Sequence, residues 1–130
     1  MSEIQTYKFY AGNRWHEPSS EKYFESEDPS IGKVWAKVPD CNEKDINLAV
    51  SSAKRAYYDG PYGKMHPAER GRTLTRIGDI IAKNAERIGK IETKDNGKLP
   101  KNITPSLTSW QTESFYYYAG MCDKLSLIHI

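Results

Sequence analysis

The first part of the chain, up to Val38, has short apolar-bearing runs separated by turn residues, which is typical of β-strands. Tyr7 and Phe9 on one side and Trp15 on the other flank a turn at residues 11–13, which reads Ala-Gly-Asn. Glycine and asparagine tolerate the positive φ angles of tight turns, so this stretch predicts a β-hairpin.

A second pair of strands surrounds residues 28–32, which read Asp-Pro-Ser-Ile-Gly. Proline at the second position and glycine at the end are typical of a type I turn followed by a bulge. On the returning side, Val34, Ala36 and Val38 occupy every second position. The pattern therefore predicts a second β ribbon.

The period changes to that of a helix at Asn42. Asn42 is a suitable N-cap, and Glu43 and Asp45 place acids in the first turn, where the helix dipole favours them. Residues 59–61, Asp-Gly-Pro, end this helix. Its apolar stripe comprises Ile46, Ala49, Val50, Ala53, Ala56 and Tyr57.

Three further helical segments follow, after a predicted linker at residues 60–63. Pro67 is a good first helical residue, and Asn84 breaks this helix and caps the next. Gly97 offers a left-handed residue to end that segment. Thr104 and Pro105 predict the start of the last helix, as its cap and first residue. The apolar faces comprise Leu74, Ile77, Ile81, Ile88, Ile91, Leu107, Trp110, Phe115, Tyr118 and Cys122.

Composition narrows the function classes. The net charge is +2, and basic residues are interleaved with acidic ones, which disfavours nucleic-acid binding. No apolar run follows Met1 and no segment has the length of a membrane span. The two cysteines lack paired spacing, which favours a reduced, cytoplasmic setting. With 130 residues, the chain is one domain or part of one.

The residues alone indicate little chemistry. Cys41 precedes a helix start, where a thiolate is mildly favoured, but neither Cys41 nor Cys122 has a histidine or carboxylate at a telling spacing, so both are interpreted as ordinary thiols. His16, His66 and His129 lack the spacing of zinc ligands. No glycine-rich phosphate loop is present. These observations predict an α/β protein without a visible catalytic centre.

Two motifs provide a route to a family. Residues 92–98 read E-T-K-D-N-G-K and residues 117–124 read Y-Y-A-G-M-C-D-K. This pair resembles the aldehyde dehydrogenase family, whose members carry E-T-x-D-N-G-K and then Y-Y-A-G-x-A-D-K. The resemblance runs from about Phe9 to Lys124, and residues 28–34, D-P-S-I-G-K-V, are similar to the family's N-P-x-T-G-E-V. Leu99-Pro100 departs from the commoner proline directly after the lysine, which leaves the subfamily open.

The resemblance implies that residues 1–124 form the N-terminal portion of an aldehyde dehydrogenase cofactor-binding domain. We then expect an α/β fold with β-hairpins or ribbons and about four helices, without the parallel sheet on which these helices pack in the family. The helices would have more apolar surface than they can cover among themselves, so the sequence predicts a loosely folded chain or a large exposed apolar patch.

The implied activity is oxidation of an aldehyde to a carboxylic acid with NAD or NADP, through a cysteine thioester. In the family that cysteine and the cofactor-binding glycines lie downstream, so we expect the 130-residue chain to be inactive. Family members are usually homodimers or homotetramers. The alternative is a non-catalytic α+β module that uses its uncovered apolar face to bind a protein.

The resemblance also carries two sets of candidate site residues. Ser106 and Trp110 fall on positions that contribute to the substrate tunnel, although Trp110 is equally compatible with a place in the core. Ser26 and Asp95 fall on positions that hold a structural monovalent cation in some members. For Asp95, a carboxylate that accepts backbone N–H groups at a helix end is the favoured alternative.

Residues 125–130, Leu-Ser-Leu-Ile-His-Ile, fit poorly with the family. They match the translation of a widely used sequencing adapter in one reading frame. The hypothesis is that this tail is non-native and the gene read was truncated; a natural β-prone tail is the alternative.

Overall fold

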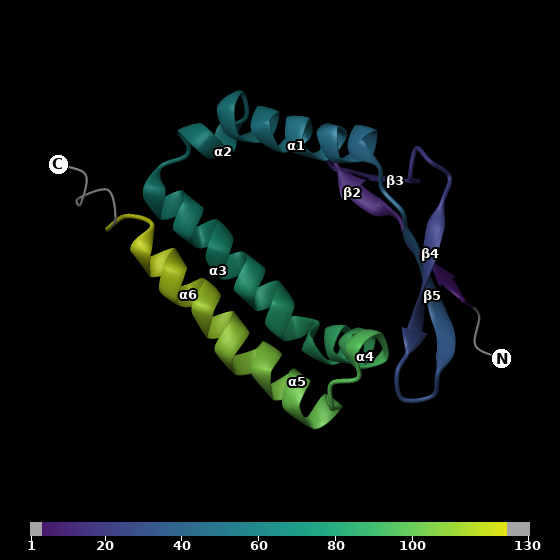
Figure 1. The fold of residues 1–130 in the computed structure, drawn as a ribbon. Coiled ribbons are helices and arrows are strands. Elements are labelled where there is room, and N and C mark those ends of the chain that lie inside the picture. The colour runs from purple at the N-terminus through teal and green to yellow at the C-terminus, as the bar shows by residue number, and fades with distance from the viewer. Residues whose placement is uncertain (1–3, 125–130) are drawn as a thin grey trace. The chain divides into compact units, whose positions relative to one another are not determined.

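The structure is a computed structural model, and it describes residues 4–124. The chain divides into two compact units, Met1–Lys64 and Met65–Ile130. The predicted tail at residues 125–130 lies outside the described residues. The first unit combines small sheets with two helices, and the second is helical (Figure 1).

The main sheet of the first unit has three strands. β4 (Tyr23–Asp28) pairs antiparallel with β5 (Lys33–Pro39), and β1 (Gln5–Thr6) pairs parallel with β5. In the turn, the Asp28 carbonyl accepts hydrogen bonds from the N–H groups of Ile31 and Gly32, and Gly32 has a φ of 59°. The predicted turn with a left-handed glycine is confirmed.

The first hairpin is also confirmed. β2 (Phe9–Ala11) pairs antiparallel with β3 (Arg14–His16). Gly12 and Asn13 have φ angles of 57° and 64°, so both central residues of the turn are left-handed, as the two-residue turn favoured in hairpins requires.

Helix α1 (Glu43–Tyr58) begins as predicted. The Asn42 side chain accepts from the N–H groups of Lys44 and Asp45, and the Asp45 carboxylate accepts from the Asn42 N–H, which completes a capping box. The predicted linker after it is wrong in part, because α2 (Pro61–Lys64) is a short helix with proline at its first position.

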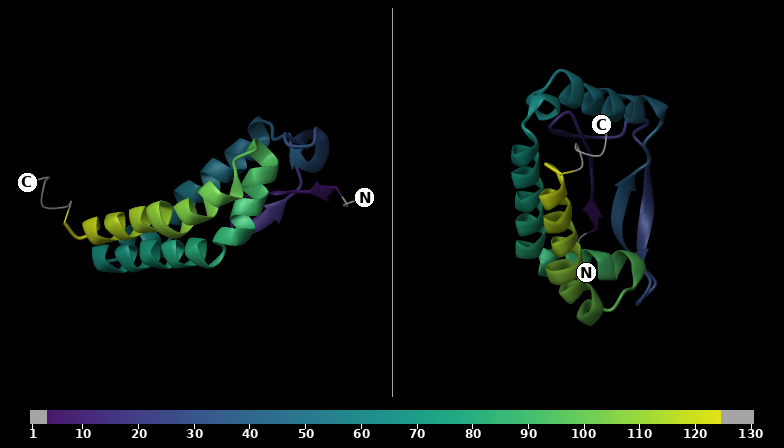
Figure 2. Two further views of the ribbon diagram at one scale, coloured as in Figure 1. Left: turned by 90° about the horizontal axis from the view of Figure 1, so that it is seen from below. Right: turned by 90° about the vertical axis from the view of Figure 1, so that its left-hand side faces the viewer.

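The second unit is built on a pair of antiparallel helices. α3 (Pro67–Lys83) lies beside α6 (Thr112–Met121), as Figures 1 and 2 show. Gly71 makes this close approach possible: a Cβ there would lie 2.7 Å from the Ala119 carbonyl oxygen. The Tyr116 hydroxyl donates to the Asp79 carboxylate at 2.7 Å, so a hydrogen bond also joins the two helices.

Helix α4 (Ala85–Asn96) follows α3 after the predicted break at Asn84. The Asn84 side chain donates to the Ile80 carbonyl, so it ends α3 without capping α4. Gly97 ends α4 with a φ of 75°, as predicted. A small core joins α4 to the segment after it; it comprises Ala85, Ile103 and Leu107, with Ile81 and Ile88 packed against it.

The predicted start of the last helix is wrong. Helix α5 (Pro100–Ser106) begins at Pro100, and the N–H groups of Asn102 and Ile103 already bond to the Leu99 carbonyl. Proline is favoured at the first helical position, so Pro100 starts the helix before Pro105 is reached. Pro105 therefore lies inside the helix, where it lacks an N–H to donate.

A π-helical turn, η1 (Leu107–Gln111), separates α5 from α6. It adds a residue to one turn, so the buried positions Leu107 and Thr112 are five residues apart. The predicted apolar face assumed α-helical spacing and is wrong at Trp110 and Tyr118, which are 75% and 61% exposed.

Many large apolar side chains of the described residues are exposed, as the resemblance led us to expect. The α1 stripe is an example, since Ile46, Val50 and Tyr57 are each about half exposed. Within residues 4–124 the buried apolar residues are few: Ala11, Pro18, Ala36, Ala85, Ile103 and Leu107. The described helices therefore leave much of their apolar surface uncovered by the chain itself.

Candidate functional site

The helical segment from α5 to α6 carries both predicted tunnel residues. Ser106 is the last residue of α5, and Trp110 lies in the π turn. Trp110 is not part of a core in its unit, since three quarters of its surface is exposed. It lines an open hollow of about 600 Å³ together with Ser109, Glu113, Ser114, Tyr117 and Tyr118.

Ser106 faces a different and smaller hollow of about 240 Å³. An ion pair lines it: the Lys98 ammonium lies 2.6 Å from the Glu92 carboxylate. The hydrogen bond from Lys98 holds the pKa of Glu92 below its usual value. The remaining lining residues are Asn102, Ile103 and Gln111. Ser106 and Trp110 therefore open on two hollows, one polar and one aromatic.

The two candidate cation ligands lie in different units. Ser26 is on β4, where its hydroxyl accepts a hydrogen bond from the Trp35 indole at 3.0 Å. Asp95 is an exposed residue near the end of α4. Within residues 4–124 the structure shows no group of three or more histidine, cysteine, aspartate or glutamate side chains that could hold a metal ion.

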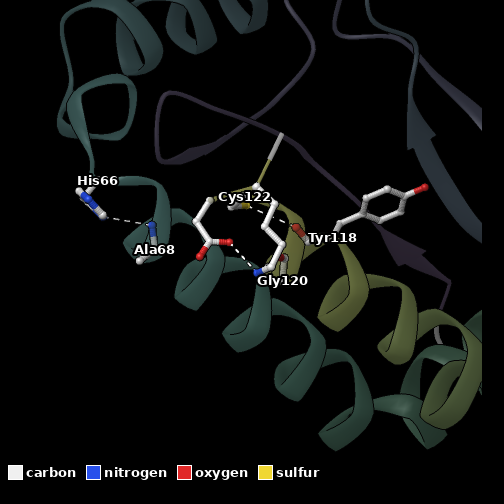
Figure 3. Close-up of polar contacts among 7 residues, drawn as sticks. His66, Ala68, Tyr118, Gly120 and Cys122 are labelled. Atoms are coloured by element: carbon white, nitrogen blue, oxygen red, sulfur yellow. Dashed lines mark hydrogen bonds and ion pairs between the residues drawn. The ribbon is translucent and has the colours of Figure 1, made fainter. Parts of the chain in front are cut away.

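Neither cysteine is arranged as a nucleophile. Burial, with further contributions from Asp45 and Asp40, raises the pKa of the Cys41 thiol, so the mild preference for a thiolate expected before a helix start is wrong. Cys122 donates through its thiol to the Tyr118 carbonyl at 3.4 Å, as Figure 3 shows. Both thiols thus behave as packing residues.

The start of α1 does not suit the phosphates of a dinucleotide. The junction of β5 with α1 is the candidate, because phosphates bind at helix N-termini that follow strands. Here the Asn42 and Asp45 side chains already accept the hydrogen bonds of the first turn, and Asp40, Glu43 and Asp45 make the junction acidic. An anionic pyrophosphate does not fit this junction.

Sequence reasoning missed the π turn and the buried Thr112 that follows it. Thr112 is 3% exposed, and its hydroxyl donates to the Leu107 carbonyl at 2.6 Å. The available signal was the interior Pro105 followed by a run of hydroxyl residues at 106, 108, 109 and 112, which can bond to carbonyls of the preceding turn.

Solved structures share this fold. The NAD⁺ complex of an aldehyde dehydrogenase from Bacillus cereus matches with a TM-score of 0.86 and 29% identity, over 92% of this chain and 24% of that one. A putative aldehyde dehydrogenase from Burkholderia cenocepacia matches with a TM-score of 0.85 and 32% identity, over 91% and 24%. The fold is therefore that of part of a dehydrogenase.

The sequence model of the aldehyde dehydrogenase family matches residues 15–129. The chain belongs to the aldehyde dehydrogenase family. Among curated relatives, the mitochondrial aldehyde dehydrogenase family 2 member B4 of Arabidopsis thaliana is 39% identical over 108 residues, which are 82% of this chain and 20% of that protein. The (Z)-2-((N-methylformamido)methylene)-5-hydroxybutyrolactone dehydrogenase of Acinetobacter baylyi is 31% identical over 94% of this chain and 24% of its own length.

The chain thus spans between 13% and 25% of the length of the curated relatives reported for it. Its relatives include a cytosolic 10-formyltetrahydrofolate dehydrogenase of Xenopus tropicalis and a mitochondrial aldehyde dehydrogenase of Rattus norvegicus. None of the helices in the described part of the chain is both long and apolar enough to cross a membrane.

Proposed function

We propose that residues 1–124 are the N-terminal portion of the cofactor-binding domain of an NAD(P)-dependent aldehyde dehydrogenase. The observation that carries the proposal is the family match over residues 15–129 on a chain whose fold agrees with solved aldehyde dehydrogenases at a TM-score of 0.86. The complete enzyme oxidises an aldehyde to a carboxylic acid through a cysteine thioester, and it is a cytoplasmic homodimer or homotetramer.

The cofactor and the catalytic cysteine belong to the remainder of the enzyme. The acidic, self-capped start of α1 does not fit a pyrophosphate, and burial raises the pKa of the Cys41 thiol. NAD or NADP, when bound to the remainder of the enzyme, accepts the hydride from the substrate. The role of the present chain is structural: it provides helices on which the sheet of the cofactor domain is built.

Within that role, Ser106 and Trp110 contribute to the aldehyde entrance. The place of Trp110 at the rim of an open hollow supports a lining role. Ser26 and Asp95 remain proposed ligands of a structural monovalent cation, with Ser26 contributing its backbone carbonyl. Oxygen ligands from a strand and a helix end suit sodium or potassium.

A chimaera tests the proposal. The corresponding segment of the Bacillus cereus aldehyde dehydrogenase is replaced by residues 4–124, and NADH formation from an aldehyde is followed. The matched control adds Gly71→Leu, because even a Cβ at this position lies 2.7 Å from the Ala119 carbonyl oxygen. We expect turnover by the chimaera and loss of turnover in the control. A folded chimaera without activity would refute the proposal.

The exposed apolar residues also favour the second candidate, a non-catalytic α+β interaction module. The chimaera separates the two. If the helices belong under the sheet of an enzyme, the chimaera binds the apolar dye ANS no more than the parent enzyme does. Dye binding that stays high in an inactive chimaera would favour the interaction module.

A further inference from the structure

The chain from Pro100 to Met121 keeps one inward face through a change of helical period. Ile103, Leu107 and Thr112 are each less than 5% exposed, although the spacing between them rises from four residues to five. The π turn Leu107–Gln111 absorbs the extra residue. On either side of it, the segments keep α-helical spacing, so the turn sets which side chains of residues 107–111 point outward.

Hydroxyl side chains bond to backbone carbonyls in this widened turn and in the end of α5 before it. Thr112 Oγ1 donates to the Leu107 carbonyl at 2.6 Å, and Ser109 Oγ donates to the Pro105 carbonyl at 2.7 Å. Thr108 Oγ1 lies 3.1 Å from the Thr104 carbonyl oxygen and 3.2 Å from that of Pro105. The Thr112 bond is the buried one of these. Its span of five residues is that of the π turn, whereas the bonds of Thr108 and Ser109 reach carbonyls three or four residues back, as in an α-helix. The Thr112 bond is therefore the side-chain bond that is specific to the wide turn.

The position of Trp110 follows from this turn. In an α-helix continued from Leu107, residue 110 would lie one turn further on the same, inward face. In the structure Trp110 instead points out, 75% exposed, and lines the hollow with Ser114, Tyr117 and Tyr118. The Tyr117 and Tyr118 rings pack edge to face at 5.3 Å, which gives the hollow an aromatic wall.

We propose that Thr112 is a positioning residue for Trp110 and thereby determines which aldehydes the enzyme accepts. Thr112 holds the π turn through its bond to Leu107, and the turn holds the indole at the hollow, where it limits the width available to a substrate. This proposal rests on the proposed function, because only an aldehyde dehydrogenase gives the hollow that substrate.

The first test observes Trp110 in the full 130-residue chain. The chain has three tryptophans, so Trp15→Phe and Trp35→Phe leave Trp110 as the sole emitter. Acrylamide quenching and the emission maximum are then measured in three versions of this single-tryptophan chain. The first keeps Thr112, the second carries Thr112→Val, which keeps the shape but loses the hydroxyl, and the third carries Thr112→Ser, which keeps the hydroxyl.

We expect Thr112→Val to lower the quenching constant severalfold and shift the emission to the blue, and Thr112→Ser to leave both unchanged. Equal quenching in the valine and parent chains would overturn the proposal. If Thr112→Val loses its helical circular dichroism, Thr112→Cys decides, because a thiol is a much weaker hydrogen-bond donor than a hydroxyl: lower quenching supports the proposal, and unchanged quenching overturns it.

The second test measures substrate choice in the active chimaera. We expect Thr112→Val to change severalfold the ratio of kcat/KM for benzaldehyde to kcat/KM for acetaldehyde, with Thr112→Ser restoring the parent ratio. An unchanged ratio would overturn the specificity claim. Failure of the proposed function is distinguishable, since a chimaera inactive with every aldehyde leaves the quenching result intact.

Discussion

The contact between α3 and α6 predicts that replacing glycine by alanine changes stability in opposite directions at Gly71 and at Gly120. At Gly71, an added Cβ would lie 2.7 Å from the Ala119 carbonyl oxygen, closer than a carbon and an oxygen can pack. This oxygen belongs to a helix backbone, so relief requires the two helices to separate. At Gly120, an added Cβ meets nothing within 4 Å. Gly120→Ala is therefore the matched control.

The magnitudes follow from two terms. Overpacking a close contact costs roughly 1–3 kcal/mol, and the rigid carbonyl places Gly71→Ala at the upper end. Alanine is better than glycine inside a helix by about 1 kcal/mol, which offsets part of that cost. We expect Gly71→Ala to lower the free energy of unfolding by about 2 kcal/mol. Gly120→Ala should raise it by up to about 1 kcal/mol, since it gains propensity without a clash.

Urea unfolding followed by far-UV circular dichroism measures both changes in the full chain. The two variants should differ in midpoint with similar urea dependence, because neither changes the surface exposed on unfolding. If Gly71→Ala proves as stable as Gly120→Ala, then α3 and α6 do not approach each other as described, and the packing argument fails.

Two further predictions concern the first unit and the uncovered apolar surface. Burial by itself would raise the pKa of Asp45, but hydrogen bonds from Asn42 and Ser19 outweigh burial and hold this pKa below its usual value of 3.8. The ionised Asp45 carboxylate therefore stabilises the fold fully above pH 3.8, and this stabilisation is lost as the pH falls through the lowered pKa. Asp45→Asn should lower the unfolding midpoint of the first unit at neutral pH and weaken the fall of this midpoint as the pH is lowered into the acid range. If the midpoint of the variant falls with pH as steeply as that of the parent, the prediction is contradicted. The exposed apolar residues predict strong ANS fluorescence from the 130-residue chain, and a signal equal to that of a well-packed domain would count against uncovered helices.

Local signals predicted most of the fold. Gly12 with Asn13, Gly32 and Gly97 have the positive φ angles that their turn positions implied, and Asn42 forms the expected capping box. These elements were predictable because each depends on a few neighbouring residues whose conformational preferences are strong.

The start and register of the last helical segment were not predictable in this way. Two prolines, Pro100 and Pro105, could each begin a helix, and the packing of Ile103 and Leu107 against α4 favours the earlier one. The π turn arises because Leu107 and Thr112 both have to face inward at a spacing of five. Such tertiary demands are absent from a periodicity count, so Trp110 and Tyr118 were expected on the wrong face.

The candidate site was reached through the family resemblance, since the residues alone indicated no chemistry. The structure places Ser106 and Trp110 on adjacent turns but at separate hollows. The hydroxyl contacts that set the position of Trp110 could be recognised only once the helical register was known.

The most direct measurement is to sequence the genomic locus past the codon for Lys124. The account predicts that the reading frame of the whole protein also encodes a glycine-rich cofactor-binding segment and a catalytic cysteine. A reading frame that encodes neither segment would contradict the account.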